Sequence, residues 1–355
     1  MESVERLLIY RLGSLGDTVV ALPAFHLIAR AFPSATRYLL TTEPSNAKEA
    51  HPSSVLDGTG LVHGYLSYPV GLRDPRQVWG LRKRIRRFKP QALIYLAEPR
   101  SKRAIMRDAL FFKACGIRRL IGVPYMRRLR ENKWLAAESC HEYEVMRLGR
   151  CISSLGAVEP DDPASWDLCL RPEEVRRADE LIQAAGIKGR FLACSPGAKI
   201  ELKDWGLENW QALMGRLGRK LSDCALALVG SAADFARGEE VAQEWPGKVL
   251  NLCGVLSPRE SAALLHRAAI FVGHDSGPMH LAAAVGTPCV AIFSARSKPR
   301  VWFPYGRMHQ VIYHRTDCYG CGLEICSVRG SECIRSITVD EVVAAVEKIL
   351  DGGCS

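Results

Sequence analysis

Long hydrophobic runs are absent from this chain of 355 residues. The longest apolar stretch covers residues 280–295, but Gly286 and Pro288 interrupt it, and a helix needs roughly 20 apolar residues to cross a bilayer. Residues 1–11 also lack the basic end and apolar core of a secretory signal. We therefore expect no transmembrane span and no export, and we predict a cytoplasmic protein.

Low-complexity tracts and repeats at a fixed spacing are lacking too. With 48% hydrophobic and 24% charged residues, the composition is that of a globular protein. The length exceeds what one ordinary core holds, which predicts two domains of about 150 to 180 residues each. Helix-turn-helix, zinc-finger and RNA-recognition signatures are absent, so no nucleic-acid partner is expected despite a net charge of +10.

The positive charge is concentrated in the first half of the chain. Residues 1–170 hold 26 Lys and Arg against 17 Asp and Glu, whereas the remainder holds 22 against 21. The densest runs are RKRIRRFK at 82–89 and RRLR at 127–130. Such runs attract anionic lipid headgroups or a phosphorylated glycolipid, and a solvated helix face is the alternative interpretation.

Short apolar segments recur at helix-length intervals, at residues 7–10, 38–40, 92–96, 191–194, 225–229, 270–272 and 290–293. Strands that alternate with helices are typical of parallel sheets built from βαβ units. A polar, proline-containing stretch at 159–163 separates two such series. We predict an α/β fold of two Rossmann-like domains, residues 1–170 and 171–337, with parallel sheets facing a central cleft. A C-terminal helix at 338–355 follows, for which packing back on the first domain is one option.

The first predicted strand is followed by RLGSLGD at residues 11–17. Gly13 and Gly16 permit a tight turn and close approach of a ligand to the backbone. Asp17 then lies in the first helical turn, at the sheet edge where open α/β folds bind ligands. Its spacing from Ser14 is that of a capping box, so Asp17 either caps the helix or acts as a general base. The local pattern alone favours the cap.

A similar strand, turn and helix start occurs at residues 271–280, which read FVGHDSGPMH. Ser276 is a predicted N-cap, and the backbone N–H groups of residues 276–279 are expected to form a phosphate site. Asp275 would accept hydrogen bonds from sugar hydroxyls, but its charge beside a phosphate requires a cation. Lys203, which follows the turn SPGA at 195–198, is the candidate cation, and a surface lysine is the alternative.

Together these segments resemble glycosyltransferase family 9, the lipopolysaccharide heptosyltransferases. The resemblance is carried by RLGSLGDT at 11–18 with LPA at 22–24, by PGA at 196–198 with KDW at 203–205, and by DSGPMHLAAA at 275–284 continuing through GTP at 286–288 to WFPYG at 302–306. It implies a GT-B architecture, with an acceptor in the first domain and an ADP-sugar, usually ADP-heptose, in the second. It also implies an inverting glycosyltransferase of the bacterial envelope whose chemistry needs no metal.

The resemblance also assigns roles to residues at matching positions. Asp17 becomes the expected base, Lys203 the phosphate-binding cation and Asp275 the contact to the donor sugar. The implied donor and phosphate residues are Lys203, Asp275, Ser276, Gly277, Pro278, His280, Pro196 and Gly197, the acceptor-side loop is Gly13, Ser14, Leu15 and Gly16, and Leu256 and Ser257 are suggested near the adenosine. An anionic glycolipid or glycan acceptor is implied, with peripheral contact at the inner membrane surface.

Thirteen cysteines in a chain without a targeting signal predict mostly buried free thiols, including Cys115, Cys169, Cys194, Cys224, Cys253 and Cys289. Four others, Cys318, Cys321, Cys326 and Cys333, fall within a short segment. Four sulfur ligands are what a structural Zn or Fe site needs, although the spacing is not that of paired CxxC motifs. Similar clusters occur in a subset of the resembling family and are thought to hold iron in some relatives. A structural Zn or Fe site is therefore one prediction for this segment, and a group of reduced thiols is the other; the sequence favours neither.

The segment SARSKPR at 294–300 departs from the loop that core heptosyltransferases often carry there. This departure leaves the donor sugar and the acceptor open, with O-antigen, capsule, a glycan-decorated protein and a secondary metabolite as candidates. The alternative from another class is a catalytically inactive nucleotide- or metal-binding regulatory protein on the same scaffold. That protein would bind ADP without transferring sugar.

Overall fold

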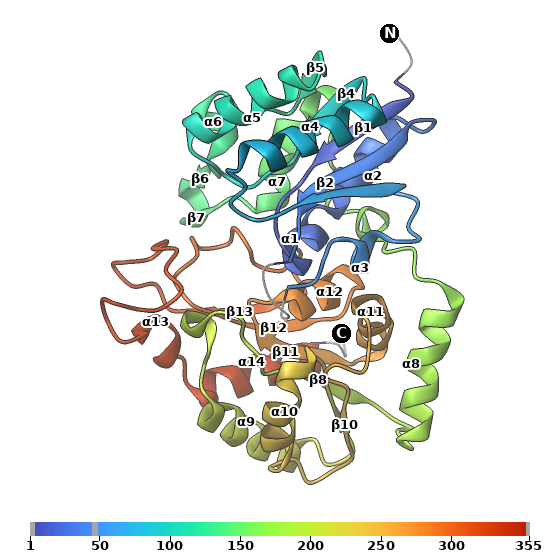
Figure 1. Ribbon diagram of the computed structural model, residues 1–355. Coiled ribbons are helices and arrows are strands. Elements are labelled where there is room, and N and C mark those ends of the chain that lie inside the picture. Colours follow the sequence, from blue (N-terminus) through green and yellow to red (C-terminus); the bar gives the residue numbers. More distant parts are fainter. Residues whose placement is uncertain (1–3, 45–48, 353–355) are drawn as a thin grey trace. The chain divides into compact units, whose positions relative to one another are not determined.

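The computed structural model describes residues 4–44 and 49–352 and divides into two compact units, Met1–Cys169 and Leu170–Ser355 (Figure 1). The predicted boundary lay one residue later, after residue 170. Among the described residues, no helix is long and apolar enough to cross a membrane.

The first unit is built on a five-stranded parallel sheet in the order β3-β2-β1-β4-β5. The strands are β1 (Arg6–Tyr10), β2 (Thr36–Thr42), β3 (Gly64–Tyr68), β4 (Ala92–Tyr95) and β5 (Arg119–Ile121). The helices are α1 (Leu15–Val20), α2 (Leu22–Ala31), α3 (Ser53–Leu56), α4 (Pro75–Phe88), α5 (Lys102–Ala114), α6 (Arg127–Arg130) and α7 (Glu144–Cys151), with a small antiparallel pair of β6 (Trp134–Leu135) and β7 (Cys140–His141).

Helices α4 and α5 cover one face of this sheet, side by side (Figure 1). Asp74 caps α4 by accepting a hydrogen bond from the Arg76 N–H, and Ser101 caps α5 in the same way. Leu8 and Tyr10 of β1 contribute to the core beneath them, together with the apolar side chains Leu81, Ile85, Ile105, Ala109 and Phe112 of the two helices. Burial of each large apolar side chain contributes about 1.5–3 kcal/mol.

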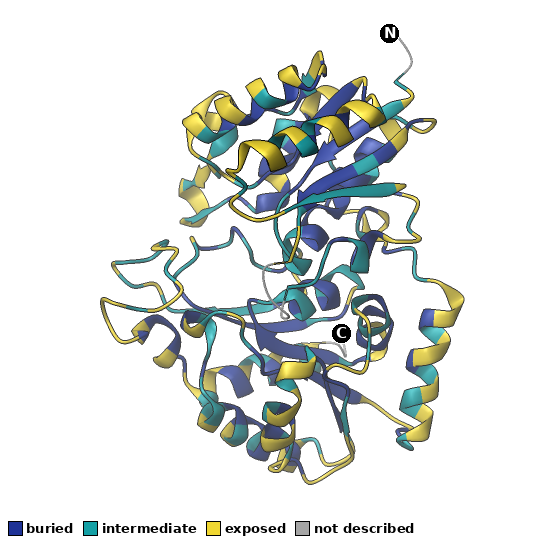
Figure 2. Cartoon of the chain, in the orientation of Figure 1, coloured by how far each residue is buried: buried dark blue, intermediate teal, exposed yellow. Residues whose placement is uncertain are grey.

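The second unit has a six-stranded parallel sheet in the order β10-β9-β8-β11-β12-β13. Its strands are β8 (Phe191–Ser195), β9 (Ala225–Leu228), β10 (Val249–Asn251), β11 (Ile270–His274), β12 (Cys289–Phe293) and β13 (Gln310–Tyr313). Its helices are α8 (Pro172–Ala184), α9 (Leu207–Lys220), α10 (Phe235–Ala242), α11 (Pro258–Arg267), α12 (Gly277–Ala284), α13 (Glu332–Arg335) and α14 (Val339–Gly352). In both units the central strands are buried, the edge strands β3 and β13 are only half-buried, and the outer helix faces are exposed (Figure 2).

The final helix α14 belongs to the core of the second unit. Val342, Val343 and Val346 are buried there against side chains of α9 and the sheet. The α/β class with two parallel sheets is confirmed.

The cysteines of the described residues are all free thiols. Cys115, Cys194, Cys253 and Cys289 are buried as predicted, and burial raises the pKa of each thiol. Two others of the predicted group, Cys169 and Cys224, are only half-buried.

Candidate active site

Each sheet reverses its winding at one point, and the predicted site residues follow the strands at those points. In the first sheet the chain leaves β1 toward β2 and later returns to β4 on the other side of β1. In the second sheet β8 and β11 are the equivalent neighbours. The carboxyl ends of the strands at such a reversal form the crevice where open α/β sheets bind ligands.

The loop after β1 holds Asp17 in a fixed orientation. The backbone N–H of Ser14 donates to Asp17 Oδ2 at 2.7 Å, and the Ser14 hydroxyl lies 3.3 Å from the same oxygen. Gly13 has φ of +112°, and a Cβ added there would lie 2.5 Å from the Asp17 Cβ. The predicted capping box is therefore present, and it involves one carboxylate oxygen. Leu15 and Gly16 complete the first turn of α1 between these groups.

A buried arginine joins the loop after β1 to the segment that follows β4. The Arg11 side chain is fully buried, and it donates to the Leu96 carbonyl at 2.7 Å and to the Asp17 carbonyl at 2.6 Å. Its Nε has no hydrogen-bond partner among the described residues. Arg11 thus connects the end of β4 with the start of α1 and places a positive charge beside Asp17.

Glu98 is a site residue that sequence reasoning missed. It follows β4 by three residues, and its side chain is hydrogen-bonded to that of Asp17. Burial, followed by the negative charge of Asp17, raises the pKa of Glu98 to about 8. The signal that could have found it is an acidic residue just after a buried strand, at the same sheet edge as Asp17.

In the second unit, Lys203 and Asp275 form an ion pair. The Lys203 Nζ lies 2.7 Å from Asp275 Oδ2 and donates to the Asp275 backbone carbonyl at 3.0 Å. His280 Nε2 lies 3.8 Å from the other carboxylate oxygen. Burial alone would raise the pKa of Asp275, but the Lys203 charge and a hydrogen bond from His280 hold it well below its usual range. Lys203 is therefore not a solvent-exposed surface lysine.

His274 connects the two donor-side motifs, and the sequence analysis did not single it out. Its Nε2 accepts from the Trp205 backbone N–H at 3.1 Å, and its Nδ1 lies 3.3 Å from the Gly197 carbonyl. Because it is fully buried, its pKa is lowered to about 4, so the ring is neutral and its proton resides on Nδ1. A histidine at the end of an apolar strand, directly before Asp275, was the available signal.

The turn at Pro196 and Gly197 is buried and tightly packed. A Cβ added to Gly197 would lie 2.5 Å from the carboxyl carbon of Asp234. Asp234 in turn accepts hydrogen bonds from the backbone N–H and hydroxyl of Ser231. The loops after β8 and β9 therefore meet at Gly197.

Two buried hydroxyls lie at the carboxyl ends of β11 and β12. The Oγ atoms of Ser276 and Ser294 are buried and have no hydrogen-bond partner among the described residues. Unsatisfied buried hydroxyls are costly, and a ligand oxygen is one way to satisfy them. Ser276 precedes α12, whose first N–H groups have no intrahelical acceptor. The expected run of donors is shorter than predicted, because Pro278 has no N–H and only Gly277 and Met279 contribute within the helix.

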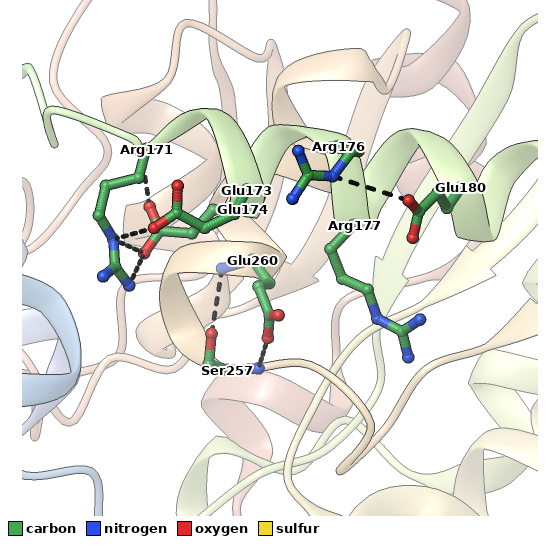
Figure 3. A pocket seen from close by; sticks show the side chains of 8 residues that line it. All are labelled: Arg171, Glu173, Glu174, Arg176, Arg177, Glu180, Ser257 and Glu260. Atoms are coloured by element: carbon green, nitrogen blue, oxygen red, sulfur yellow. Dashed lines mark hydrogen bonds and ion pairs between the residues drawn. The ribbon is translucent and has the colours of Figure 1, made fainter.

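The residues suggested for adenosine lie at the start of α11. Ser257 caps this helix, since its Oγ accepts from the Glu260 N–H at 3.3 Å and its own N–H donates to Glu260 at 2.8 Å. It also lines a hollow of about 470 Å³ between α8 and α11 (Figure 3). Every other residue lining this hollow is Arg or Glu, so it offers no aromatic or apolar surface on which an adenine would stack. Leu256 is half-buried beside it.

The cysteine cluster does not form the predicted metal site. Among the described residues, no group of three or more His, Cys, Asp and Glu side chains is arranged to hold a metal ion. Cys333 is buried at the start of α13, whereas Cys321 is exposed in the preceding loop. Cys318 and Cys326 take local partners instead, the Thr316 hydroxyl and the Arg329 N–H. The prediction of structural Zn or Fe is not supported.

Two Rossmann-like units, each with polar loops at the winding reversal of its sheet, define the structural class. A profile described as glycosyltransferase family 9 (heptosyltransferase) matches residues 104–330. Because this match covers more than half of the chain, the protein belongs to glycosyltransferase family 9. The matched range includes Lys203, His274 and Asp275, whereas Asp17 and Glu98 precede it.

Individual relatives are more distant. The chain is 27% identical over 180 residues to lipopolysaccharide heptosyltransferase 3 of Escherichia coli K12, covering 48% of this chain and 49% of that protein. It therefore spans about half the length of the curated relatives it matches. The crystal structure of a family 9 glycosyl transferase from Veillonella parvula aligns with a TM-score of 0.76, 18% identity and 98% coverage of both chains. An E. coli heptosyltransferase solved with ADP-2-deoxy-2-fluoro heptose aligns with a TM-score of 0.62, 17% identity, and 97% and 99% coverage.

Proposed function

We propose that this protein is an inverting glycosyltransferase that moves a heptose from ADP-heptose to an anionic glycan or glycolipid of the bacterial envelope. Family membership and the heptosyltransferase names of the matching relatives support the reaction class. The ADP-sugar bound in one structural neighbour supports the donor. The observation that carries the proposal is the ion pair of Lys203 with the buried Asp275 at the winding reversal of the second sheet, where two buried hydroxyls at the strand ends have no hydrogen-bond partner within the described part of the chain.

The donor diphosphate is proposed to bind at Lys203, Ser276 and the first turn of α12. An ammonium group has three donors, and two of those on Lys203 go to Asp275, which leaves the third for a phosphate oxygen. The N–H groups of Gly277 and Met279 point out of the helix start, where the helix dipole favours an anion. Asp275 then accepts hydrogen bonds from sugar hydroxyls while Lys203 balances its charge.

Asp17 is the proposed general base. Its carboxylate accepts the proton of the acceptor hydroxyl as the acceptor oxygen bonds to the anomeric carbon. The bond from that carbon to the diphosphate oxygen breaks, and ADP leaves with the electron pair. Attack from the face opposite the leaving group inverts the anomeric configuration. Lys203 and the α12 N–H groups stabilise the negative charge that grows on ADP, so the proposed chemistry needs no metal ion.

A calorimetric comparison of ADP-, UDP- and GDP-sugars tests the donor assignment. We expect measurable binding of ADP-heptose and ADP, and at least about tenfold weaker binding of the UDP and GDP analogues. Substitution Lys203→Met is expected to weaken ADP binding, and Lys220→Met on the far end of α9 is the matched control. Equal affinity for all three nucleotides would contradict the proposed donor. Binding of ADP without any transfer would favour the inactive regulatory protein.

A basic surface on the first unit is proposed to contact the membrane that carries a glycolipid acceptor. Helices α4 and α5 hold ten Lys and Arg, and their one acidic residue, Asp108, is buried. We call the exposed outer side of these helices the cationic face; it includes Arg76, Lys83, Arg84, Arg86, Arg87, Lys102, Arg103, Arg107 and Lys113. Figure 2 shows the exposed outer sides of both helices.

Apolar side chains project from the same face. Trp79, Met106 and Leu110 are exposed by 53%, 42% and 65%, and the Lys83 Nζ lies 3.5 Å from the Trp79 ring centroid. An amphipathic surface with cations around an aromatic ring suits an anionic bilayer, to which each nearby Lys or Arg contributes about 1 kcal/mol. These features favour a lipid surface over a merely solvated helix face.

Vesicle sedimentation tests this surface. Wild-type protein is expected to bind vesicles with 30 mol% phosphatidylglycerol about tenfold or more better than neutral phosphatidylcholine vesicles. The double substitution Trp79→Ser with Leu110→Ser should reduce that binding severalfold, whereas Arg176→Ser with Arg177→Ser on α8 should not. Equal binding by both variants, or no preference for anionic vesicles, would remove the cationic face from the proposal.

A further inference from the structure

Glu98 and Asp17 are brought together by the strand order of the first sheet. Strands β1 and β4 are hydrogen-bonded neighbours with Tyr10 opposite Tyr95, so the segments that follow them leave the same sheet edge. Asp17 lies in the first turn of α1 and Glu98 three residues beyond β4. Arg11 holds the two segments together, because it donates to the Leu96 carbonyl and to the Asp17 carbonyl, and the side chains of Glu98 and Asp17 meet there. Two neighbouring carboxyl groups form a hydrogen bond only when one of them carries a proton.

The surrounding charges decide which carboxyl carries that proton. Burial and the charges of Asp17 and Glu144 raise the pKa of Glu98, whereas Arg11 lowers it. Glu144 is itself fully buried and paired with the buried Arg147. With Glu98 neutral, the two carboxylates of Asp17 and Glu144 balance the two guanidinium groups of Arg11 and Arg147. With Glu98 ionised, this buried cluster carries an unbalanced negative charge, which is costly.

The hydrogen bonds in the loop after β1 fix the Asp17 carboxylate, so a proton on Glu98 would point toward it. The Ser14 N–H already occupies Asp17 Oδ2, and Arg11 binds the Asp17 backbone carbonyl. A donor on Glu98 adds a second fixed hydrogen bond to the Asp17 carboxylate. A carboxylate held by two donors from different segments has its remaining lone pairs fixed in space, as a base must to meet an incoming hydroxyl.

We propose that Glu98 is a positioning residue for the base Asp17: it keeps its own proton through the reaction and donates it in a hydrogen bond that orients the Asp17 carboxylate toward the acceptor. This inference rests on the proposed function. During transfer the acceptor O–H bond breaks and an O–H bond forms on Asp17. The Glu98 proton stays on Glu98, and Asp17 later releases its proton to solvent.

The first test is the pH profile of kcat in full-length protein, measured as ADP release from ADP-heptose with a heptose-deficient lipopolysaccharide as the acceptor. Wild-type activity is expected to fall above about pH 8, because Glu98 then loses its proton and the hydrogen bond to Asp17. In Glu98→Gln the side-chain amide still donates but does not titrate. This variant should keep activity at pH 7 within about threefold and lose the alkaline decline, whereas Glu98→Ala should lose about tenfold or more at pH 7. An unchanged alkaline decline in Glu98→Gln would overturn the inference.

A second readout needs no acceptor. Infrared spectra at pH 7 should show the C=O band of a protonated carboxyl group that disappears by pH 9.5 and is missing in Glu98→Gln. In Asp17→Asn this band should disappear at lower pH than in the wild type, because the neighbouring negative charge that raises the pKa of Glu98 has gone. A wild-type spectrum without this band at pH 7, or a band that survives in Glu98→Gln, would refute a protonated Glu98.

The two readouts separate this inference from the proposed function. If Asp17→Asn transfers sugar normally while the infrared band belongs to Glu98, the base assignment fails and the hydrogen-bonded pair remains. If Asp17→Asn is inactive but Glu98→Gln shares the wild-type pH profile, the base assignment stands and the role of Glu98 fails.

Discussion

Removal of the Lys203 charge should separate its contribution to stability from its contribution to donor binding. The perturbation is Lys203→Met, which keeps most of the side-chain volume. Asp275 is 7% exposed and the Lys203 side chain 18% exposed, so the substitution leaves a buried carboxylate without its cation. Breaking a fully buried pair costs about 3–5 kcal/mol, and an exposed pair contributes less than about 1 kcal/mol. Because water reaches Lys203 in part, we expect a loss of about 2–3 kcal/mol.

The double variant Lys203→Met with Asp275→Asn supplies the internal control. It removes both charges, so most of the lost stability should return. Donor binding should not return, because both variants lack the ammonium group that meets the diphosphate. We expect the Kd for ADP to rise about 10- to 100-fold in both, measured by calorimetry beside chemical denaturation. Recovery of ADP binding together with stability would refute the proposed contact between Lys203 and the phosphate.

The pH dependence of this loss has a definite sign. Asp275 has a folded-state pKa below its usual range, so its pairing stabilises the fold above about pH 4 and this contribution is lost as the pH falls further. The stability deficit of Lys203→Met should therefore be largest at neutral pH and shrink on acidification below pH 4. A deficit that grows in acid would contradict the assigned ion pair.

Three further predictions follow from single residues. Because burial lowers the pKa of His274 to about 4, the free energy of unfolding should fall between pH 6.5 and 4 with a slope of up to about 1.4 kcal/mol per pH unit, and His274→Asn should flatten that slope in denaturation curves. Gly13→Ala places a Cβ against Asp17 at a positive φ, so transfer should drop about tenfold or more while calorimetry finds ADP affinity unchanged. Glu174→Gln breaks the buried pair with Arg259 and should cost about 3 kcal/mol of unfolding free energy in chemical denaturation at pH 7. Hydrogen bonds from Arg259 and Arg171 outweigh burial and lower the pKa of Glu174 to about 2, so the loss of stability should vanish in stronger acid. A stability difference between wild type and variant that persists below pH 2 would contradict this pairing.

Much of the fold could be predicted, because apolar segments at helix-length spacing identify strands of parallel sheets. The loops at Asp17 and Asp275 could also be predicted from the sequence, since glycines, a cap residue and an acidic residue follow a strand in each. The order of the strands in the sheet could not be predicted. Only the order shows that β4 returns beside β1, and this return brings Glu98 against Asp17.

Other features depend on packing that a linear pattern does not contain. His274 reads as part of an apolar strand, and its role emerges only when the loops of Gly197 and Trp205 meet it. The sequence did not decide which domain α14 packs against, because its apolar stripe suits either one. In the structure its valines lie in the core of the second unit. Four cysteines in one short segment suggested metal ligands, but the described residues hold no group arranged to bind a metal ion, and the four thiols differ in exposure.

The base assignment of Asp17 is tested most directly by comparing wild-type protein with Asp17→Asn in two measurements on the same samples. One is the initial rate of heptose transfer from ADP-heptose to heptose-deficient lipopolysaccharide, and the other is the Kd for ADP-heptose. The account predicts a rate lower by on the order of 100-fold or more in Asp17→Asn, with a Kd within about twofold of the wild-type value. A transfer rate in Asp17→Asn close to that of the wild type would contradict it.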